Sequence, residues 1–583
     1  MSRHAHFSGP AALFPTLPDP VRHNLLLGSC GVLHLLDTAG QVLCHAKTDK
    51  SCSASSDQPG DQSKPDQELA AMAMDMLLAA LGERPLARDL AAQILSLPDV
   101  ASRLSSRQQR ELGLLARTAP PPESARHFQR LAAQRDMDRL RAFVLSRAQT
   151  EPDQLFWREQ LLILSVAEGD PDLAARALDA EILRNMPGVH AALGWQAACL
   201  DQDFPRAAEL ARQCAPLFGT GFAATREAEA LLAQEKRSQG VAALLRGVTA
   251  SPWRTNELLR VHELLEQWDT ARIPMRGDVR ILLYTWNKGH DLDEALQTLA
   301  ESDLGMARIT VLNNGSTDQT AAVLGAWQAR LGRERLSIVE LPVNIGAPAA
   351  RNWLLHTEAR DADWVVYLDD DALVPRDWLA LFGAAVARQP EAGVWGCRVV
   401  DHAQPMLAQA VDYQPAPLSR EQHCPAEPDL TRLQPHPFKL SNLHIQGLDR
   451  GQFEYVRPCA SVTGCCHLFR RDRMAEAGDF SLFLSPSQYD DMERDLRVLA
   501  SGRTAAYQGH LRVRHKKRTG RDSLLPGPEN SNALGNRYKM QVLHGPQEVE
   551  HSARQVFDAL EADLLARLDR VQDALKPLDH PEE

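Results

Sequence analysis

The sequence of 583 residues lacks any run of about 20 uninterrupted apolar residues, the length that a membrane-spanning helix needs. Its best apolar run near the start, Leu25 to Leu36, is interrupted by two glycines, a serine and a histidine. The first ten residues also lack the charged and then apolar layout of a secretory signal. We therefore expect no transmembrane segment and a cytoplasmic chain.

An excess of positive charge and a cysteine framework are also missing. The 64 Lys and Arg residues face 76 Asp and Glu residues, a net charge of −12, so we expect no general electrostatic binding of nucleic acid. The ten cysteines include no CxxC pair, which fits a reducing compartment. Cys465, Cys466 and His467 are adjacent, but adjacent cysteines rarely point at one metal ion, so a zinc site there is disfavoured.

What is present is an ordinary globular composition, with 44% hydrophobic and 24% charged residues. The length exceeds what one hydrophobic core usually supports, so we expect two or three domains. We predict four parts: residues 1–66 as a small N-terminal segment with a flexible linker, 67–275 as α-helical repeats, 276–545 as an α/β domain, and 546–583 as a C-terminal amphipathic helix.

Within the first part, residues 22–46 resemble short strands around a turn at Thr38-Ala39-Gly40. Residues 48–66 are mainly Ser, Asp, Pro and Lys, with almost nothing to bury. We predict that they form the flexible linker.

The helical part contains a weak repeat, clearest over residues 155–255. A turn followed by an alanine-rich helix recurs three times, with Ala174, Ala207 and Ala242 lying 33 and 35 residues apart. This pattern resembles tetratricopeptide (TPR) repeats, whose helix pairs recur near 34 residues. An irregular helical bundle is the alternative. Stacked helix pairs make concave surfaces, so this part can offer a groove to a protein partner or a face for dimerisation.

From Val279 the pattern changes to apolar strands that alternate with amphipathic helices. The predicted strands cover 279–285, 307–313, 336–342, 363–369 and 394–400. The predicted helices between them cover 291–303, 318–332 and 347–358. This alternation is typical of a mostly parallel, Rossmann-like sheet with helices on both faces.

Polar residues follow the predicted strands, at the edge where an open α/β sheet binds ligands. Thr285-Trp286-Asn287 follows the first strand, and Asn313 begins an Asn-Asn-Gly-Ser-Thr-Asp turn after the second. Arg351 lies on the helix after the third strand, as a solvated residue or near a phosphate-bearing ligand. Three consecutive aspartates, Asp369 to Asp371, follow the fourth strand. Their mutual repulsion is costly unless a cation lies among them, and carboxylates suit Mg²⁺ or Mn²⁺; a solvated acidic turn is the alternative.

Taken in order, the segment 279–518 resembles the family 2 glycosyltransferases of the GT-A fold. The matching motifs are the Thr-x-Asn-like turn Tyr284–Asn287, the D-(D/N)-G-S-x-D-like turn Asn313–Asp318, the N-x-G-x-x-x-A-R-N element Asn344–Asn352, the D-x-D motif Asp369–Asp371, the acidic helix Asp490–Gly502 and the late histidine His515. The resemblance implies a metal-dependent inverting glycosyltransferase that moves a sugar from a nucleotide-diphosphate sugar to the hydroxyl of a glycan, lipid or protein acceptor.

The resemblance also implies roles for individual residues. Asp371 and His515 would hold Mn²⁺ or Mg²⁺, and Asp369 would contact the metal or the ribose. Asp491 would be the general base that deprotonates the acceptor. The nucleotide sugar would be lined by Thr285, Asn287, Asn313 and Arg351. The basic run from Arg512 to Arg518 can hold a diphosphate or an anionic acceptor.

Two departures from the family pattern affect these roles. Asn313 stands where the family usually has aspartate, which leaves the base of the donor open. Asp490 and Glu493 replace glutamate and aspartate and keep the charge but change its reach.

Two other functions compete with glycosyl transfer. Another phosphate-handling enzyme is disfavoured, since Ala372-Leu373 after the triplet does not fit a haloacid-dehalogenase-like phosphatase, and the first strand is not followed by the glycine-rich loop of a nucleotidyltransferase. A non-catalytic helical scaffold with a decayed transferase domain is disfavoured because the expected metal and base residues are present.

Overall fold

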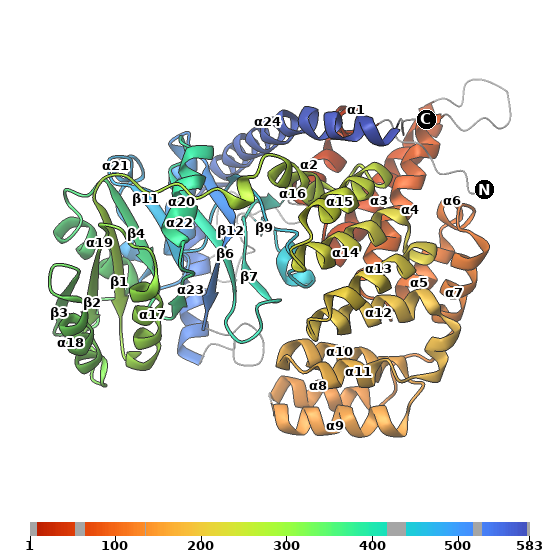
Figure 1. The fold of residues 1–583 in the computed structure, drawn as a ribbon, viewed down its shortest axis with the longest axis horizontal. Helices are drawn as coiled ribbons and strands as arrows, with labels where there is room; N and C mark the ends of the chain where they lie inside the picture. The colour runs from red at the N-terminus through yellow and green to blue at the C-terminus, as the bar shows by residue number, and fades with distance from the viewer. Residues whose placement is uncertain (1–8, 53–63, 135, 417–438, 517–526, 580–583) are drawn as a thin grey trace. The chain divides into compact units, whose positions relative to one another are not determined.

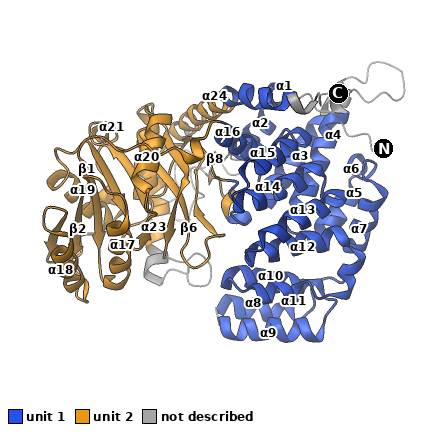
Figure 2. Cartoon of the chain, in the orientation of Figure 1, with its two compact units in different colours: residues 1–265, 445–452, 565–583 blue, residues 266–444, 453–564 orange. Residues whose placement is uncertain are grey.

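The computed structural model describes residues 9–52, 64–134, 136–416, 439–516 and 527–579. The chain forms two compact units, which Figure 2 colours separately. The first unit comprises residues 1–265, 445–452 and 565–583, and the second comprises 266–444 and 453–564.

The described residues of the first unit form helices and no strand, which confirms the prediction of a helical first half. The first eight helices are α1 (Pro10–Leu13), α2 (Asp19–Leu27), α3 (Val32–Cys52), α4 (Lys64–Glu83), α5 (Arg88–Ser96), α6 (Pro98–Ala101), α7 (Ser106–Ala116) and α8 (Ala125–Gln134). The next eight are α9 (Met137–Thr150), α10 (Leu155–Glu168), α11 (Pro171–Ala177), α12 (Pro187–Leu200), α13 (Phe204–Phe218), α14 (Thr220–Ala233), α15 (Arg237–Ala250) and α16 (Thr255–Leu265). Successive helices from α12 to α15 lie side by side (Figure 1).

The prediction of strands over 22–46 is wrong, because this segment forms α2 and most of α3. Leu35, Ala39, Val42 and Ala46 are buried, and their spacing of four, three and four residues is helical rather than alternating. Gly40 lies exposed within α3 and has open space around it, so it is tolerated there instead of forming a turn.

The linker predicted over 48–66 falls mostly outside the described residues. Its two ends are helical, since residues 48–52 close α3 and residues 64–66 open α4. Pro65 is compatible with this start, because the first turn of a helix does not use the amide hydrogen that proline lacks.

The predicted repeat has a counterpart in the helix positions. Helices α11, α13 and α15 begin at Pro171, Phe204 and Arg237, and are therefore 33 residues apart. The fourth residue of each helix is small and buried, and these residues are Ala174, Ala207 and Gly240. Gly240, rather than the predicted Ala242, thus occupies the repeat position that corresponds to Ala174 and Ala207. A Cβ atom on Gly240 would lie 2.6 Å from the side chain of Leu232. Membership of the TPR class itself stays a prediction.

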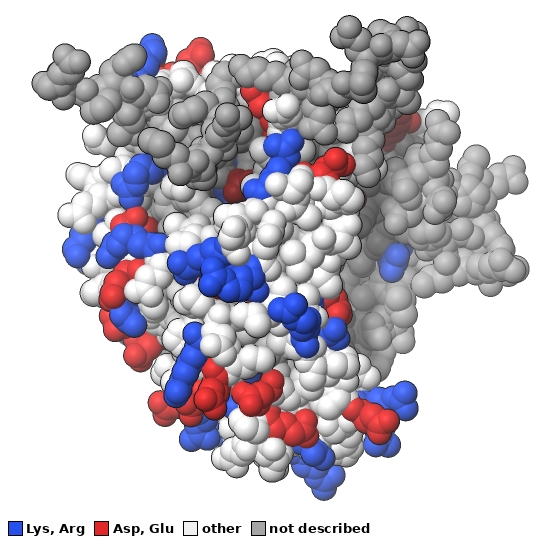
Figure 3. Space-filling model, turned by 90° about the vertical axis from the view of Figure 1, so that its right-hand side faces the viewer, with Lys and Arg blue, Asp and Glu red and all other residues white. Residues whose placement is uncertain are grey.

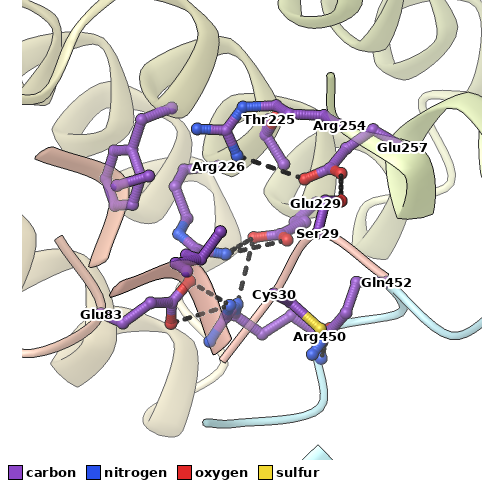
Figure 4. A pocket seen from close by; sticks show the side chains of 13 residues that line it. Ser29, Cys30, Glu83, Thr225, Arg226, Glu229, Arg254, Glu257, Arg450 and Gln452 are labelled. Atoms are coloured by element: carbon purple, nitrogen blue, oxygen red, sulfur yellow. Dashed lines mark hydrogen bonds and ion pairs between the residues drawn. The ribbon is translucent and has the colours of Figure 1, made fainter. Parts of the chain in front are cut away.

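A cluster of buried charged side chains fills part of the first unit and lines a small cavity (Figure 4). Its members are Glu83 on α4, Arg226 and Glu229 on α14, Arg254 and Glu257 at α16, and Arg450 in segment 445–452. Arg226 donates to Glu229 at 2.9 Å and also pairs with Glu83. Arg450 donates to Glu83 at 3.0 Å, and Arg254 pairs with Glu257 at 3.4 Å. We call these six residues the helical-unit cluster.

The second unit is an α/β domain. Its strands are β1 (Val279–Thr285), β2 (Arg308–Asn314), β3 (Leu336–Leu341), β4 (Trp364–Leu368), β5 (Ala372–Leu373), β6 (Val394–Asp401), β7 (Ala408–Ala410), β8 (Pro415–Ala416), β9 (Lys439–Leu440), β10 (Val456–Cys459), β11 (Cys466–Arg470) and β12 (Ala505–His515). Its helices are α17 (Gly289–Glu301), α18 (Thr320–Leu331), α19 (Ala347–Thr357), α20 (Trp378–Arg388), α21 (Met474–Ala477), α22 (Asp490–Ala500), α23 (Gly527–Leu543) and the first part of α24 (Pro546–Asp579).

The main sheet has the strand order β10-β12-β6-β11-β4-β1-β2-β3 (Figure 1). The pairs β3–β2, β2–β1, β1–β4 and β6–β12 are parallel, as predicted. Strand β11 is antiparallel to both β4 and β6, so it breaks the parallel order in the middle of the sheet. The carboxyl ends of β1, β2 and β4 meet at one edge, where the polar predicted site residues follow.

Strand β12 crosses to this edge with an irregularity in its register. Gln508 pairs with Cys397 of β6, but the next paired residue, Arg512, lies opposite Arg398. Three residues of β12 are thus left over between the two pairs, which makes a β-bulge. Beyond it His515 lies opposite Asp401 and, on the other side, opposite Ala372 of β5. The register therefore brings His515 next to Asp371, the residue before β5.

The predicted C-terminal helix is present as α24. Its predicted stripe includes the buried residues Val556, Phe557, Leu560, Leu564, Leu568 and Val571. Among the described residues, we find no helix that combines the length and the apolar character needed to cross a membrane.

Candidate active site

The acid triplet lies directly after β4, with its backbone fixed on both sides. The Asp369 amide donates to the carbonyl of Cys465 at 2.8 Å, and the Asp371 carbonyl accepts from the Lys516 amide at 3.0 Å. Asp370 and Asp371 are buried. Burial and the neighbouring carboxylates raise the pKa of Asp370 to about 6, although Lys288 opposes this shift. Such a cluster is unfavourable as it stands and is stabilised by additional positive charge.

His515 faces two members of the triplet, as predicted. Its Nε2 lies 3.0 Å from Oδ1 of Asp371 and 4.0 Å from Oδ2 of Asp369. Its Nδ1 lies 2.8 Å from Oε1 of Gln409, so an Nδ1–H donated to this amide oxygen directs the lone pair of Nε2 toward the aspartates. Burial opposes protonation of His515, but Asp371 outweighs it and raises the pKa of the imidazole.

Lys288 is a site residue to which the sequence analysis gave no role. Its Nζ lies 2.8 Å from Oδ2 of Asp371 and 3.2 Å from Oδ1 of Asp370. The two aspartates outweigh burial and raise the pKa of the ammonium group. Its position immediately after Asn287, at the end of β1, was the available signal, since β1 and β4 are neighbours.

The residues after β1 and β2 form one connected loop pair. Asn287 has a φ of +53°, and its amide donates to Oγ of Ser316 at 2.9 Å while its side-chain oxygen accepts from the Thr317 amide at 2.7 Å. Thr285 is buried as the last residue of β1. These contacts hold the two turns together at the sheet edge, where the resemblance puts the nucleotide.

Asn313 lies at the same edge, but its side chain already has partners. Its Nδ2 donates to Oε2 of Glu340 on β3 at 2.7 Å, and its Oδ1 accepts from the Ser316 amide at 3.1 Å. The next residue but one, Gly315, has a φ of +73°, and a Cβ atom there would lie 2.7 Å from the backbone of Val343. The turn therefore needs a glycine at this position.

Arg351 is buried and joins the triplet to α22. Its guanidinium forms an ion pair with Asp490 and lies 3.8 Å from Oδ1 of Asp369. It also lies over the ring of Tyr284, with its Cζ 5.3 Å from the ring centroid. Burial raises the pKa of Asp490 to about 6 despite this pairing. Arg351 thus lies between Asp369 and Asp490, and its contact with a donor stays a prediction.

Asp491 is the second residue of α22 and is close to the backbone of the segment before β11. Its Oδ2 accepts from the Gly464 amide at 2.6 Å, and its Oδ1 accepts from the Met492 amide at 2.8 Å. A Cβ atom on Gly464 would lie 2.8 Å from this Oδ2 and 2.9 Å from Nη2 of Arg351. Only glycine therefore fits between the predicted base and Arg351 without a shift of one of them.

One short segment connects the predicted base with the predicted metal ligands. Gly464 donates its amide to Asp491, and the next residue, Cys465, accepts from the amide of Asp369. The structure thus brings together Asp369, Asp371, Arg351, Asp491 and His515, which come from four separate segments of the sequence. Gln409 and Lys288 complete this set and were missed. Only tertiary pairing places Gln409 here, whereas Lys288 follows Asn287 directly in the sequence.

The donor groups around Asp369, Asp371 and His515 fit a divalent cation. Two carboxylates and an imidazole nitrogen converge, the imidazole tautomer is fixed by Gln409, and the triplet has excess negative charge.

The predicted basic run is only partly described. Arg512 and Arg514 are exposed on β12, and Lys516 donates to Glu294 at 2.9 Å and pairs with Asp291 at 2.6 Å. Lys517 and Arg518 lie outside the described residues, so a role of the run in binding a diphosphate stays a prediction.

Residues 281–472 match the model of the family "Glycosyl transferase family 2". A relative among characterised proteins, the O-antigen biosynthesis protein RfbC of Myxococcus xanthus, is 24% identical over 258 residues, which is 43% of this chain and 18% of that protein. This chain therefore spans less than a fifth of the relative that it matches.

Two solved structures are similar at low scores. One is GalNAc-T7 with UDP, GalNAc and Mn²⁺, with 14% identity, a TM-score of 0.33 and coverage of 46% of this chain and 48% of that chain. The other is the mannosyltransferase PcManGT from Pyrobaculum calidifontis with GDP-Man and Mn²⁺, with 16% identity, a TM-score of 0.30 and coverage of 59% and 100%.

The family match covers β1 to β11, and the sheet described above has the mostly parallel strand order that the resemblance predicted. It includes the acid triplet and Arg351, while Asp491 and His515 follow it in the sequence. The second unit of this chain therefore contains a segment, residues 281–472, that is similar to glycosyl transferase family 2.

Proposed function

We propose that this chain is a metal-dependent inverting glycosyltransferase, which moves a sugar from a nucleotide-diphosphate sugar to an acceptor hydroxyl. The observation that carries the proposal is the convergence of Asp369, Asp371 and His515 beside Asp491 at the edge of the matched domain. In a decayed domain we would not expect one segment, Gly464 to Cys465, to keep contact with both the predicted metal ligands and the predicted base.

On the donor side, Thr285, Asn287 and Asn313 would line the nucleotide, and Arg351 would hold the negative charge near Asp369. Mn²⁺ or Mg²⁺ held by Asp369, Asp371 and His515 would supply positive charge to the leaving diphosphate. Lys288 would serve the same end from the protein side, because its ammonium group already faces this site.

On the acceptor side, Asp491 would take the proton of the hydroxyl. The acceptor oxygen then forms a bond to the anomeric carbon while the bond from that carbon to the diphosphate breaks, and its electron pair leaves with the nucleoside diphosphate. Attack from the face opposite the leaving group inverts the anomeric centre. The Gly464 amide orients the Asp491 carboxylate for this step.

The acceptor class is proposed only in outline. The matched relative is named for O-antigen biosynthesis, so a saccharide acceptor is the first to test. A protein partner on the helical repeats is a second possibility for the first unit. Figure 3 shows both basic and acidic side chains on one face of the molecule, separated by uncharged surface, so this face does not single out a partner of one charge.

A cytoplasmic location also stays a proposal. It is supported by buried or half-buried free thiols, namely Cys199, Cys214, Cys397, Cys459, Cys465 and Cys466. Cell fractionation with an antibody to the chain tests it, and recovery in the secreted fraction would contradict it.

The function is tested by a thermal-shift panel that combines Mn²⁺ or Mg²⁺ with UDP, GDP, dTDP or CDP. A ligand at 100 times its Kd stabilises the folded state by about 2.7 kcal/mol, which raises Tm by a few degrees. We expect one nucleotide to give a metal-dependent shift that Asp371→Ala abolishes. The matched control is Asp361→Ala, since Asp361 is exposed on the same domain.

The panel also decides between the proposal and its alternatives. No shift with any pair would contradict a sugar-nucleotide donor and favour the scaffold. A shift that persists in Asp371→Ala would place nucleotide binding elsewhere and contradict the assigned site.

A further inference from the structure

Cys465 lies against the predicted metal ligands, although it belongs to none of the motifs. Its Sγ, a carboxylate oxygen of Asp369 and a ring nitrogen of His515 all lie within 4.8 Å of one another. The side chain is buried, with 4% of its surface exposed, and it is a free thiol. Three potential ligand atoms at this separation can contact one ion, because metal–ligand bonds of about 2.0–2.3 Å place ligand atoms up to about twice that distance apart.

The strand pairing explains why Cys465 and not its neighbours faces the site. Cys466 pairs with Leu368, so Cys465 comes opposite Asp369. The carbonyl of Cys465 accepts a hydrogen bond from the Asp369 amide. His467 lies among the rings of Tyr367, Phe469 and Phe480, with centroid distances of 5.5, 4.7 and 6.1 Å. The adjacent Cys-Cys-His sequence therefore makes no metal site by itself, and only its first residue reaches the ligands from other segments.

We propose that Cys465 is a further protein ligand of the cation held by Asp369, Asp371 and His515. This inference rests on the proposed metal-dependent function. It adds one sulfur to the carboxylate oxygens and the imidazole nitrogen of the site. Sulfur disfavours Mg²⁺, which takes oxygen ligands, and favours Mn²⁺, Co²⁺, Zn²⁺ or Cd²⁺ over it.

The surroundings hold these ligands in place before an ion arrives. Oε1 of Gln409 accepts from Nδ1 of His515 at 2.8 Å, and its Nε2 donates to Oδ2 of Asp401 at 3.4 Å and to the His515 carbonyl at 3.5 Å. The amide orientation is therefore fixed with its oxygen toward the imidazole. Lys288 forms ion pairs with Asp370 and Asp371. Asp369 has no ion pair with Lys288 among those described and is the member of the triplet beside the thiol.

Coordination requires no oxidant or reductant. A bond forms between Sγ and the metal ion, and the thiol proton leaves to solvent as the ion binds. The metal keeps its oxidation state, and the remaining positions stay open for water and the donor diphosphate.

The test is a Co²⁺ titration of the purified full-length chain, read by absorption. A thiolate bound to Co²⁺ gives a sulfur-to-metal charge-transfer band in the near ultraviolet, whereas oxygen and nitrogen ligands do not. We expect this band in the wild type, its loss in Cys465→Ser, and its loss in His515→Ala. The matched control is Cys44→Ser, because Cys44 is an exposed cysteine outside the second unit and should leave the band unchanged.

Each other outcome counts against the inference. A band that survives Cys465→Ser, or that Cys44→Ser removes, would assign the sulfur elsewhere. Co²⁺ binding without any such band, together with a metal-dependent nucleotide shift, would overturn the role of Cys465 and leave the proposed function standing. If Co²⁺ does not bind and no nucleotide gives a shift, both the role of Cys465 and the proposed function are overturned.

A second measurement keeps the inference testable if Cys465→Ser does not fold. Cadmium NMR of the wild-type chain distinguishes a sulfur-containing site from an oxygen and nitrogen site by its chemical shift. A shift typical of one sulfur ligand, with competition by Mn²⁺ stronger than by Mg²⁺, supports the inference. A shift typical of oxygen ligands alone contradicts it.

Discussion

The two units each contain a cluster of buried charged side chains, and the two clusters differ in charge balance. The helical-unit cluster has three glutamates and three arginines, each in an ion pair with a member of the opposite charge. The site of the second unit has five aspartates, Asp369, Asp370, Asp371, Asp490 and Asp491. Their cations are Lys288, Arg351 and, when protonated, His515. The first set is neutral, and the second is short of positive charge.

The pKa values follow this difference. Burial alone would raise the pKa of Glu83, but Arg226 and Arg450 outweigh burial and lower it. Burial raises the pKa values of Asp370 and Asp490 to about 6, because their cations do not compensate for it. A neutral buried network holds elements together, whereas a network with unbalanced charge can gain free energy by binding a cation. The comparison thus separates a structural cluster from a functional one.

The largest effect is expected from Asp491→Asn, which removes the proposed base and keeps the size of the side chain. We expect turnover to fall about 10²–10⁴-fold, because general base catalysis contributes this much. The measurement is the initial rate of nucleoside diphosphate release with and without acceptor. The nucleotide thermal shift should stay within error of the wild type, and an unchanged rate would contradict the assignment of the base.

Breaking the helical-unit cluster should cost stability and leave ligand binding alone. Glu83→Gln leaves the guanidinium groups of Arg226 and Arg450 with less negative charge in a buried site. The loss of one partner of such a pair costs about 3–5 kcal/mol, so we expect a Tm lowered by several degrees.

Glu83→Gln should lower the Tm of the ligand-free chain without changing how much ligands raise the Tm. Its Tm increase with metal and nucleotide should equal that of the wild type. A changed response would show that the helical-unit cluster also takes part in donor binding. The control is Glu209→Gln, since Glu209 forms an exposed ion pair with Arg206.

Asp495 is a buried carboxylate of the second unit, and its protonation should make the stability of the fold depend on pH. It is buried, and burial raises its pKa to about 7, although it accepts from Oγ of Ser461 at 2.8 Å and the Val462 amide at 3.0 Å. The protonated form is favoured in the folded state. The associated stability is thus present below about pH 4, where the unfolded carboxyl titrates, and is lost as the pH rises through about 7.

Asp495→Asn should remove this pH dependence and keep the acceptor oxygen. Each pKa unit of the shift corresponds to about 1.4 kcal/mol. The free energy of unfolding of the variant should therefore rise relative to that of the wild type between pH 5 and pH 8, by an amount on the order of tenths to a few kcal/mol. Denaturation at a series of pH values measures this. Parallel curves for wild type and variant would contradict the raised pKa, and Asp361→Asn serves as the exposed control.

The smallest effect is expected from Lys288→Met. Its side chain is 40% exposed, so solvent screens its ion pairs and we expect the metal-free chain to lose only about 1 kcal/mol. Mn²⁺ should reduce this loss, because the ion supplies the missing charge. The matched control is Lys516→Met, whose partners Asp291 and Glu294 lie outside the triplet, so Mn²⁺ should not reduce its loss. Equal metal responses of the two variants would contradict the view that the triplet lacks charge.

Much of the second unit was predictable, because its strands carry strong local signals. Val279 to Thr285 is an apolar and β-branched run apart from Arg280, and it forms β1 with the predicted ends. Asp369, Asp371, Asp491 and His515 were found through motif order. By contrast, Gln409 and His515 are 106 residues apart, and only the pairing of β12 with β6 and β5 brings them together. Cys465 was not predicted as a metal ligand, because adjacent cysteines rarely point at one metal ion.

The first unit was harder to predict, because its signals are weak. Residues 22–46 contain a Thr-Ala-Gly step that favours a turn, yet tertiary burial of Leu35, Ala39 and Val42 selects a helix. The helical-unit cluster could not be foreseen either, since Glu83, Arg226 and Arg450 are individually ordinary charged residues. Arg450 is separated from Glu83 by 367 residues, so no local pattern connects them.

The β-bulge of β12 limits how this domain can change in length during evolution. Its three extra residues decide which side chain lies opposite Asp401, and with them that residue is His515. Deleting one of the three would bring Lys516 to this place, and inserting one would bring Arg514, because the register shifts by one residue and reverses the faces. Single insertions and deletions in this strand would therefore exchange the proposed metal ligand for a cationic side chain, so we expect active relatives to keep only length changes that restore the register.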